Sequence, residues 1–281
     1  MIPAEFDYVR PETIDEAIAA LAEPGAAVLA GGQSLIPDLK VRRKRLRALI
    51  DLAGVPGLDS ITPDAGAVSI GAMARQAEIM AWAGTRLPLL AEAGDAAADP
   101  MIRRRGTLVG ACCEAAPGGD WVAAALALDA VMVVVGPAGT RRIPLTDFVI
   151  GPGITTLGQG EIAVSIRLRV PPPGTASAYR KVGHIAVGWS IGSVAVILGR
   201  RPDGSPERVR VAVSGATAHP QRLTGLEDVL ERIDLGNGTE VAEAVEDTLA
   251  DLEYQGDYYA SARFRRKRLA VLLRRTLVEL N

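Results

Sequence analysis

The sequence contains few of the residue types on which metal and nucleophilic chemistry commonly depend. Among 281 residues there are two cysteines and two histidines. Cys112 and Cys113 are adjacent, so they are poorly placed for an unstrained disulfide and too few to hold zinc or an iron–sulfur cluster. His184 and His219 lack the spacing of a nucleophile's base or a metal ligand. The sequence therefore predicts no metal site and leaves any catalytic residue unknown.

The chain also lacks a strong net charge and a long apolar segment. Its formal net charge is −2, which gives no reason to expect binding to nucleic acid. The longest apolar stretch, residues 121–135, is interrupted by Asp129 and is too short to cross a bilayer. Acidic residues near the start stand where a secretion signal would be basic. Together with the scarcity of cysteine, this favours a cytoplasmic protein with no membrane span.

The patterns that are present predict a chain of alternating helices and strands. Thr13 with Glu16 has the spacing of a capping box, which predicts a helix after Thr13. Short apolar runs predict strands, among them a pair at residues 189–199 and 209–217, and helical periodicity predicts helices at residues 239–252 and 264–280. Pro171–Gly174 is the clearest linker. We expect three αβ units with boundaries near residues 57 and 175, giving segments 1–57, 58–175 and 176–281.

The first candidate binding segment follows a predicted strand at residues 26–30. Gly31 and Gly32 have no Cβ, so the turn can adopt positive φ and a ligand can approach the bare backbone. Gln33 adds side-chain donors, and Ser34 is a possible N-cap for a helix at residues 35–40. A helix start with exposed N–H groups attracts phosphate. The alternative is an ordinary strand-to-helix turn.

A second glycine-bounded segment, GTLVGACCEAAPGGD, spans residues 106–120 and is expected to be a loop. Thr107 could bond a phosphate, and Asp120, at the start of a predicted helix, could accept from a ribose hydroxyl. The alternative is a loop followed by a helix cap. Two separated glycine segments suit a ligand with two ends, such as a dinucleotide.

These segments occur in the order found in a known family. The chain reads MIPAEFDYVRP, AGGQSLIPDLK, RRRGTLVGACCEAAPGGD, DFVIGPG, GEIAVSIRLRVPPPGTASAYRKV and SARFRRKRLAVLLRR. Over essentially its whole length it resembles the FAD-binding medium subunit of the molybdenum hydroxylases, the carbon monoxide dehydrogenase and xanthine dehydrogenase group. The resemblance implies an α+β fold, in which a two-subdomain FAD-binding region of the vanillyl-alcohol-oxidase-like type precedes a C-terminal αβ domain with a small antiparallel sheet.

The resemblance also implies a function and a set of FAD-binding residues. The chain would pass electrons from a small [2Fe-2S] subunit to an external acceptor, while a large molybdopterin-binding subunit oxidises the substrate. Ala30 to Ser34 match the family's first diphosphate loop, and residues 107–111 match its second. Asp120 matches an aspartate near the nucleotide, Lys181 a lysine near the flavin, and Trp189 an aromatic residue beside the ring. The implied FAD-binding residues are Ala30, Gly31, Gly32, Gln33, Ser34, Thr107, Gly110, Ala111, Asp120, Lys181 and Trp189.

The second segment departs from the family's usual Thr-Ile-Gly-Gly-Asn pattern. Val109 replaces the first glycine, and Ala111 replaces the asparagine. Because valine resists positive φ, we expect this segment to run differently from the family's loop. Two alternatives follow. One is a stand-alone enzyme on the same scaffold that acts on a small molecule with altered or lost FAD binding. The other is an assembly subunit with an empty cleft.

Two further features have a structural and a functional interpretation. The basic run from Arg42 to Arg47 is either a solvated face or a docking surface for an acidic partner. Cys112 and Cys113 are expected to be small packing residues, with a redox role as the alternative.

Overall fold

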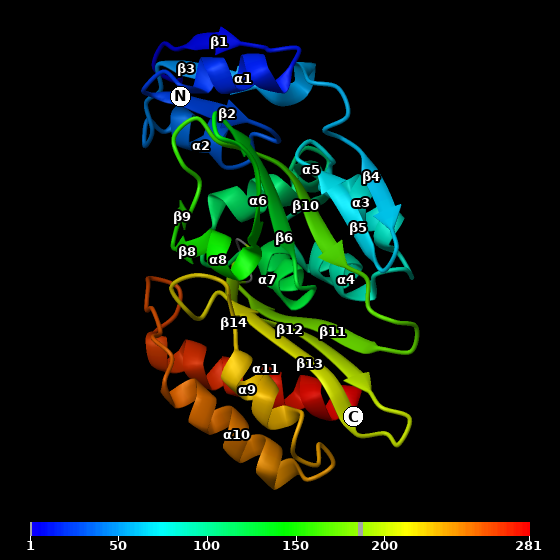
Figure 1. Cartoon of the computed structure of the whole chain (residues 1–281). Coiled ribbons are helices and arrows are strands. Elements are labelled where there is room, and N and C mark those ends of the chain that lie inside the picture. The colour runs from blue at the N-terminus through cyan, green and yellow to red at the C-terminus, as the bar shows by residue number, and fades with distance from the viewer. Residues whose placement is uncertain (1, 185–187) are drawn as a thin grey trace.

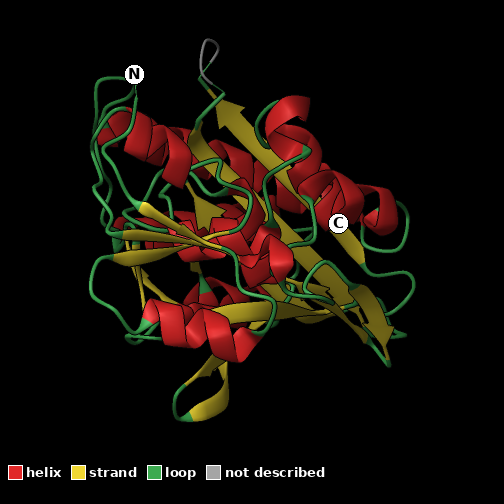
Figure 2. Cartoon of the chain, turned by 90° about the horizontal axis from the view of Figure 1, so that it is seen from above, coloured by secondary structure: helices red, strands yellow, loops and turns green. Residues whose placement is uncertain are grey.

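The computed structural model describes residues 2–184 and 188–281, which form three layers, each built on its own sheet (Figure 1). The chain starts in the first layer and ends in the third, and the two termini lie on opposite sides of the molecule (Figures 1 and 2). One fold class, α+β, therefore describes the whole chain, as the sequence predicts.

The first layer is a parallel three-stranded sheet of order β1-β3-β2. Its strands are β1 (Asp7–Val9), β2 (Ala26–Leu29) and β3 (Ala48–Asp51), with helices α1 (Ile14–Leu21) and α2 (Leu35–Lys40) between them and the short 3₁₀ turn η1 (Leu52–Gly54) after β3. Thr13 caps α1 as predicted, since its side chain accepts a hydrogen bond from the N–H of Glu16.

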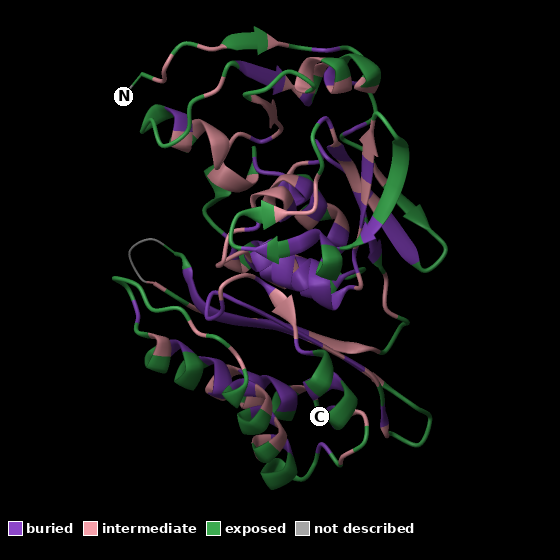
Figure 3. Ribbon diagram, turned by 60° about the vertical axis from the view of Figure 1, so that its left-hand side comes forward, coloured by how far each residue is buried: buried purple, intermediate pink, exposed green. Residues whose placement is uncertain are grey.

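The second layer is an antiparallel five-stranded sheet of order β4-β5-β10-β6-β7, covered by helices. α7 is buried at every position, because its sequence DWVAAALA is almost entirely apolar (Figure 3). The elements are β4 (Ile61–Asp64), β5 (Ala67–Gly71), β6 (Val131–Gly136), β7 (Gly139–Pro144), β8 (Val149–Gly151), β9 (Ile154–Thr155), β10 (Ile162–Arg169), α3 (Gln76–Ala83), α4 (Pro88–Ala96), α5 (Pro100–Arg103), α6 (Leu108–Glu114), α7 (Asp120–Ala127) and α8 (Leu145–Phe148).

The third layer is an antiparallel sheet of order β11-β12-β13-β14, and the helices of this layer pack on its outer face (Figure 1). The sequence predicts the paired strands β12 and β13 and the two long helices correctly. The elements are β11 (Ala176–Gly183), β12 (Ser190–Arg200), β13 (Pro206–Ser214), β14 (Gln221–Arg222), α9 (Thr224–Leu230), α10 (Gly238–Ala250) and α11 (Ala262–Leu280).

Strand alternation makes the third sheet part of two cores. Val209, Val211 and Val213 of β13 pack with the helices of this layer. Ala212, which points to the opposite face, belongs to the core that contains α7. The inner face of this sheet is therefore the surface through which the third layer docks on the second.

Candidate functional site

Gly31 brings the two glycine segments into contact. It is buried, and a methyl group placed on it would lie 2.3 Å from the carbonyl oxygen of Arg105 and 2.8 Å from Cα of Gly106. Such distances leave no room for any side chain at Gly31. The turn after β2 consequently lies directly against the backbone that leads into Thr107, although the two segments are far apart in the sequence.

The same turn presents a row of unused backbone donors. Gly32 has a φ of 71°, which favours glycine. Within the part of the chain that the structure describes, the N–H groups of residues 32–35 donate to no protein acceptor. Ser34 occupies the N-cap of α2, but its side chain makes no capping bond, and Gln33 Nε2 bonds the Gly31 carbonyl at 3.4 Å. Consecutive free N–H groups of this kind form a cradle for an anion.

The second segment is a helix and not the loop predicted from the sequence. α6 begins at Leu108, and Thr107 is its N-cap, with Oγ1 accepting from the N–H of Gly110 at 3.0 Å. Val109 and Ala111 have ordinary helical backbone, and no residue from 107 to 114 has positive φ. The prediction of a loop was wrong, and Val109 fits the helical backbone without strain.

Two residues that belong to no recognised sequence motif bond the backbone at the start of α6. Gln76 is buried, and its Nε2 donates to the carbonyl of Thr107 at 3.3 Å. A guanidinium nitrogen of Arg75 donates to the carbonyl of Arg105 at 2.7 Å. Sequence reasoning missed both residues, because their partners are about thirty positions away and only the folded chain brings them together.

Asp120 and Lys181 form a buried ion pair between the second and third layers. Asp120 is the first residue of α7, with Gly119 and not Asp120 as the N-cap. Lys181 Nζ lies 2.7 Å from Oδ2 of Asp120 and also donates to the carbonyl of Ala96. The hydroxyl of Tyr179 donates to Oδ1 at 2.5 Å.

Burial governs the charge of this group. It raises the pKa of the Asp120 carboxyl, while the Lys181 ammonium and the hydrogen bond from Tyr179 act in the opposite direction. Burial also raises the pKa of the Tyr179 phenol well above its ordinary value. Tyr179 is therefore a neutral donor, and the pair ties two layers together at the start of α7.

Trp189 is a large aromatic residue with 71% of its surface exposed. It lies next to the start of β12, and its carbonyl accepts from the N–H of His184 at 2.9 Å. A methyl group on Gly183 would lie 3.4 Å from Cε of Lys181 and 3.7 Å from the Trp189 carbonyl oxygen. Gly183 therefore lies close to both the Lys181 side chain and the Trp189 backbone.

The predicted residues therefore form two groups. One group surrounds the contact between Gly31 and the start of α6, and the other surrounds Asp120, Lys181 and Trp189. α6 and a short turn connect the groups, and a seven-residue helix spans about 10 Å. This arrangement fits an elongated ligand whose anionic part lies at the glycine turn.

The basic run beside the first group is largely solvent-exposed. Arg43 pairs with Asp38 at 2.7 Å, and Arg47 pairs with Glu23 at 3.3 Å. Exposed pairs of this kind contribute little to stability. A docking role for this run stays a prediction.

The adjacent cysteines are free and pack inside the second layer. Cys112 is fully buried, and Cys113 packs against the same core. Burial raises the pKa of Cys113 to about 12 and that of Cys112 well above its ordinary value. Both thiols are consequently protonated at neutral pH, which supports packing and argues against a redox role.

We expect native Cys113 to react with iodoacetamide about a thousandfold more slowly than an unperturbed thiol near pH 8, because only the thiolate attacks. Mass spectrometry of the native chain after timed labelling measures this rate. The urea-unfolded chain serves as the control, in which both cysteines should label quickly. Rapid labelling of the native chain would contradict the assigned environment.

The described residues contain no group of three or more histidine, cysteine or acidic side chains that could hold a metal ion. Across residues 2–184 and 188–281, no helix combines the length and apolar character required to cross a membrane.

Comparisons with known proteins cover the whole chain. A family described as "FAD binding domain in molybdopterin dehydrogenase" matches residues 4–172, and one described as "CO dehydrogenase flavoprotein C-terminal domain" matches residues 177–280. The chain is 35% identical to the carbon monoxide dehydrogenase medium chain of Hydrogenophaga pseudoflava over 80% of this chain and 79% of that one. It is 34% identical to the nicotine 6-hydroxylase medium subunit of Paenarthrobacter nicotinovorans, and the match covers 97% of this chain and 96% of that one. A solved carbon monoxide dehydrogenase from Hydrogenophaga pseudoflava superposes with a TM-score of 0.94 at 32% identity, covering 100% of this chain and 98% of that one.

Proposed function

Because the chain belongs to the family of FAD-binding medium subunits of the molybdenum hydroxylases, we propose that the turn from Ala30 to Ser34 holds the FAD diphosphate. The chain is an FAD-binding electron-transfer subunit of a multi-subunit oxidoreductase. The FAD-binding segments correspond to residues 1–57 and 58–175, and residues 176–281 form the covering domain. The break between the two matched families near residue 175 supports the second boundary.

The observation that carries the proposal is the row of free N–H groups from Gly32 to Leu35. Amide donors that bond no protein acceptor must be satisfied by water or by a ligand. A diphosphate supplies anionic oxygens that can accept from several adjacent donors. Because Gly31 lies directly against the Arg105 backbone, we assign the start of α6, with Thr107, Gly110 and Ala111, to the other side of that anion.

The second group of residues, Asp120, Lys181 and Trp189, is separate from the proposed diphosphate site. Lys181 is fixed by Asp120 and the Ala96 carbonyl, so its ammonium is held in one position at the edge of the third sheet. Trp189 offers an exposed aromatic side chain, which suits contact with a flat ring. We assign these residues to the flavin end of the cofactor. Asp120 acts mainly by positioning Lys181.

When bound, FAD accepts electrons and passes them on, and the chain contributes binding and orientation. Electrons reach the flavin from a small [2Fe-2S] subunit, after a large molybdopterin-binding subunit has oxidised the substrate, and they leave to an external acceptor. We place this complex in the cytoplasm. The helical backbone at Val109 and Ala111 removes the backbone argument for a stand-alone enzyme, while the asparagine donor that the family has at position 111 is still missing.

A change at Gly32 tests the assignment. We expect Gly32→Val to weaken FAD binding by about tenfold or more, because valine at a φ of 71° is strained and the turn must rearrange. Titration of the FAD-free full chain, followed by flavin fluorescence, measures the dissociation constants.

Gly66→Val is the matched control. Gly66 has a φ of 69° and open space around its Cα, but it lies in the turn between β4 and β5. The Gly66→Val variant should have the same backbone strain as Gly32→Val, but it should bind FAD with wild-type affinity. If wild-type protein ignored FAD, the cofactor assignment would fail. If both variants bound like wild type, only the site assignment would fail.

A further inference from the structure

A hollow of about 640 Å³ lies between the second and third layers, apart from every residue assigned to FAD. It is lined by the end of α7 and the turn after it, by Arg169 at the end of β10, by the linker at 171–175, and by the adjoining ends of β12 and β13. Its size falls within the range of small-molecule sites. Both domains and the linker contribute to its wall.

The hollow exists because the third sheet extends beyond the helix that covers it. Ala212 and Ile197 on the inner face pack in the core with α7. Arg210 and Arg208 continue that face beyond the end of α7, since alternate residues of β13 point the same way. Opposite Arg208 in the strand register is Gly199, whose lack of a side chain keeps the floor open.

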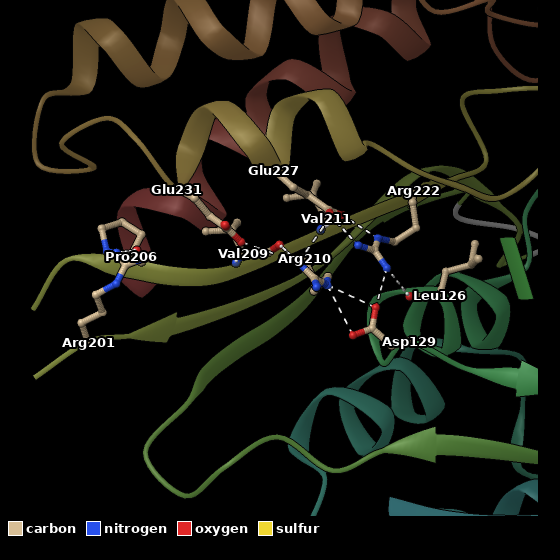
Figure 4. Close-up of polar contacts among 10 residues, drawn as sticks. All are labelled: Leu126, Asp129, Arg201, Pro206, Val209, Arg210, Val211, Arg222, Glu227 and Glu231. Atoms are coloured by element: carbon tan, nitrogen blue, oxygen red, sulfur yellow. Dashed lines mark hydrogen bonds and ion pairs between the residues drawn. The ribbon is translucent and has the colours of Figure 1, made fainter. Parts of the chain in front are cut away.

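The lining carries a strong excess of positive charge. Five arginines line the hollow, at positions 169, 200, 201, 208 and 210, against the carboxylates of Asp129 and Glu207. Arg210 and Asp129 are paired with each other, and Arg222 also binds Asp129 (Figure 4), so the positive charge open to a ligand is that of the other four arginines. Arg201 bonds the neutral carbonyl of Pro206 at 2.7 Å. Among the described residues, no carboxylate pairs with Arg169 or Arg208.

We propose that this hollow binds a small anion that carries phosphoryl groups. Guanidinium groups bind phosphate oxygens through paired hydrogen bonds, and several at one concave surface strengthen the local field. Arg169 belongs to the second layer and Arg208 to the third, so one anion between them would join the two domains across their linker. The ligand would be either an inorganic polyphosphate or the phosphate end of a nucleotide.

Calorimetric titration of the full chain tests this proposal. Pyrophosphate and ADP are titrated separately at roughly 0.15 M salt, which suppresses weak surface binding. Saturating FAD is present throughout, so that neither anion can occupy the flavin site. We expect binding of pyrophosphate. Equal affinity for ADP would assign the site to the diphosphate alone, and tighter binding of ADP would assign it to a nucleotide.

Three variants locate the site. Arg169→Gln and Arg208→Gln should each raise the dissociation constant about tenfold or more, since each removes a charged donor. Gly199→Leu should block binding without changing the charge. Arg167→Gln is the control: it lies on the same strand and pairs with Asp64 at 3.1 Å, outside the hollow. It should change affinity less than about twofold.

The proposal is overturned if neither anion binds, or if the arginine variants bind as well as wild type. Equal weakening by Arg167→Gln would also overturn it, because the effect would then be one of general charge. None of these results would touch the FAD assignment, which rests on Gly32 and on the flavin titration.

Discussion

Gly31→Ala is expected to lower FAD affinity at least about a hundredfold, a loss of roughly 2.7 kcal/mol or more. The new Cβ would lie 2.3 Å from the carbonyl oxygen of Arg105, and backbone atoms cannot move aside by changing a rotamer. The turn and the start of α6 must therefore separate. Equilibrium titration of the FAD-free variant with FAD measures the loss.

The control for this change is Gly225→Ala. Gly225 lies in α9, where an added methyl group meets no atom within 4 Å. Its FAD affinity should equal that of the wild type. Circular dichroism of Gly31→Ala should show the same helix and strand content as wild type, which separates a local opening from unfolding. A folded Gly31→Ala variant with wild-type affinity would contradict the proposed diphosphate site.

Arg222→Met is expected to lower the free energy of unfolding by about 3 kcal/mol, because it breaks a buried charge cluster. The Arg222 side chain is only 10% exposed, and it bonds Asp129 at 2.7 Å and also Glu227, which is 4% exposed (Figure 4). Methionine keeps much of the volume and leaves the Glu227 carboxylate to the more distant Arg210, at 3.7 Å. Urea denaturation, followed by circular dichroism, measures the change.

A surface arginine provides the comparison. Arg167 pairs with Asp64, and both side chains are about half exposed or more. Arg167→Met should cost less than about 1 kcal/mol, since water screens the pair. If Arg222→Met and Arg167→Met lowered the free energy of unfolding equally, burial of the Arg222 cluster would contribute nothing to stability. Because Asp129 belongs to the second layer and Arg222 to the third, we also expect Arg222→Met to loosen the domain contact.

Local sequence patterns predicted much of the secondary structure, because those patterns act over a few residues. Thr13 caps α1, the helix at residues 35–40 is α2, and the strands after the proline linker pair as expected. The exception was the segment after Thr107. Its glycines and small residues are typical of a loop, yet α6 forms there because the apolar side chains of Leu108, Val109 and Cys112 are buried against the second sheet.

The sequence by itself determined the family, the αβ organisation and the glycine turn that can leave backbone donors open. Those properties depend on residue type and short spacing, which the chain carries before it folds. Only the tertiary structure decided that Gly31 touches Arg105, that Asp120 pairs with Lys181 across 61 positions, and that Arg210 meets Asp129 across 81. Such contacts depend on how whole layers dock through their buried faces, and no local pattern specifies that docking.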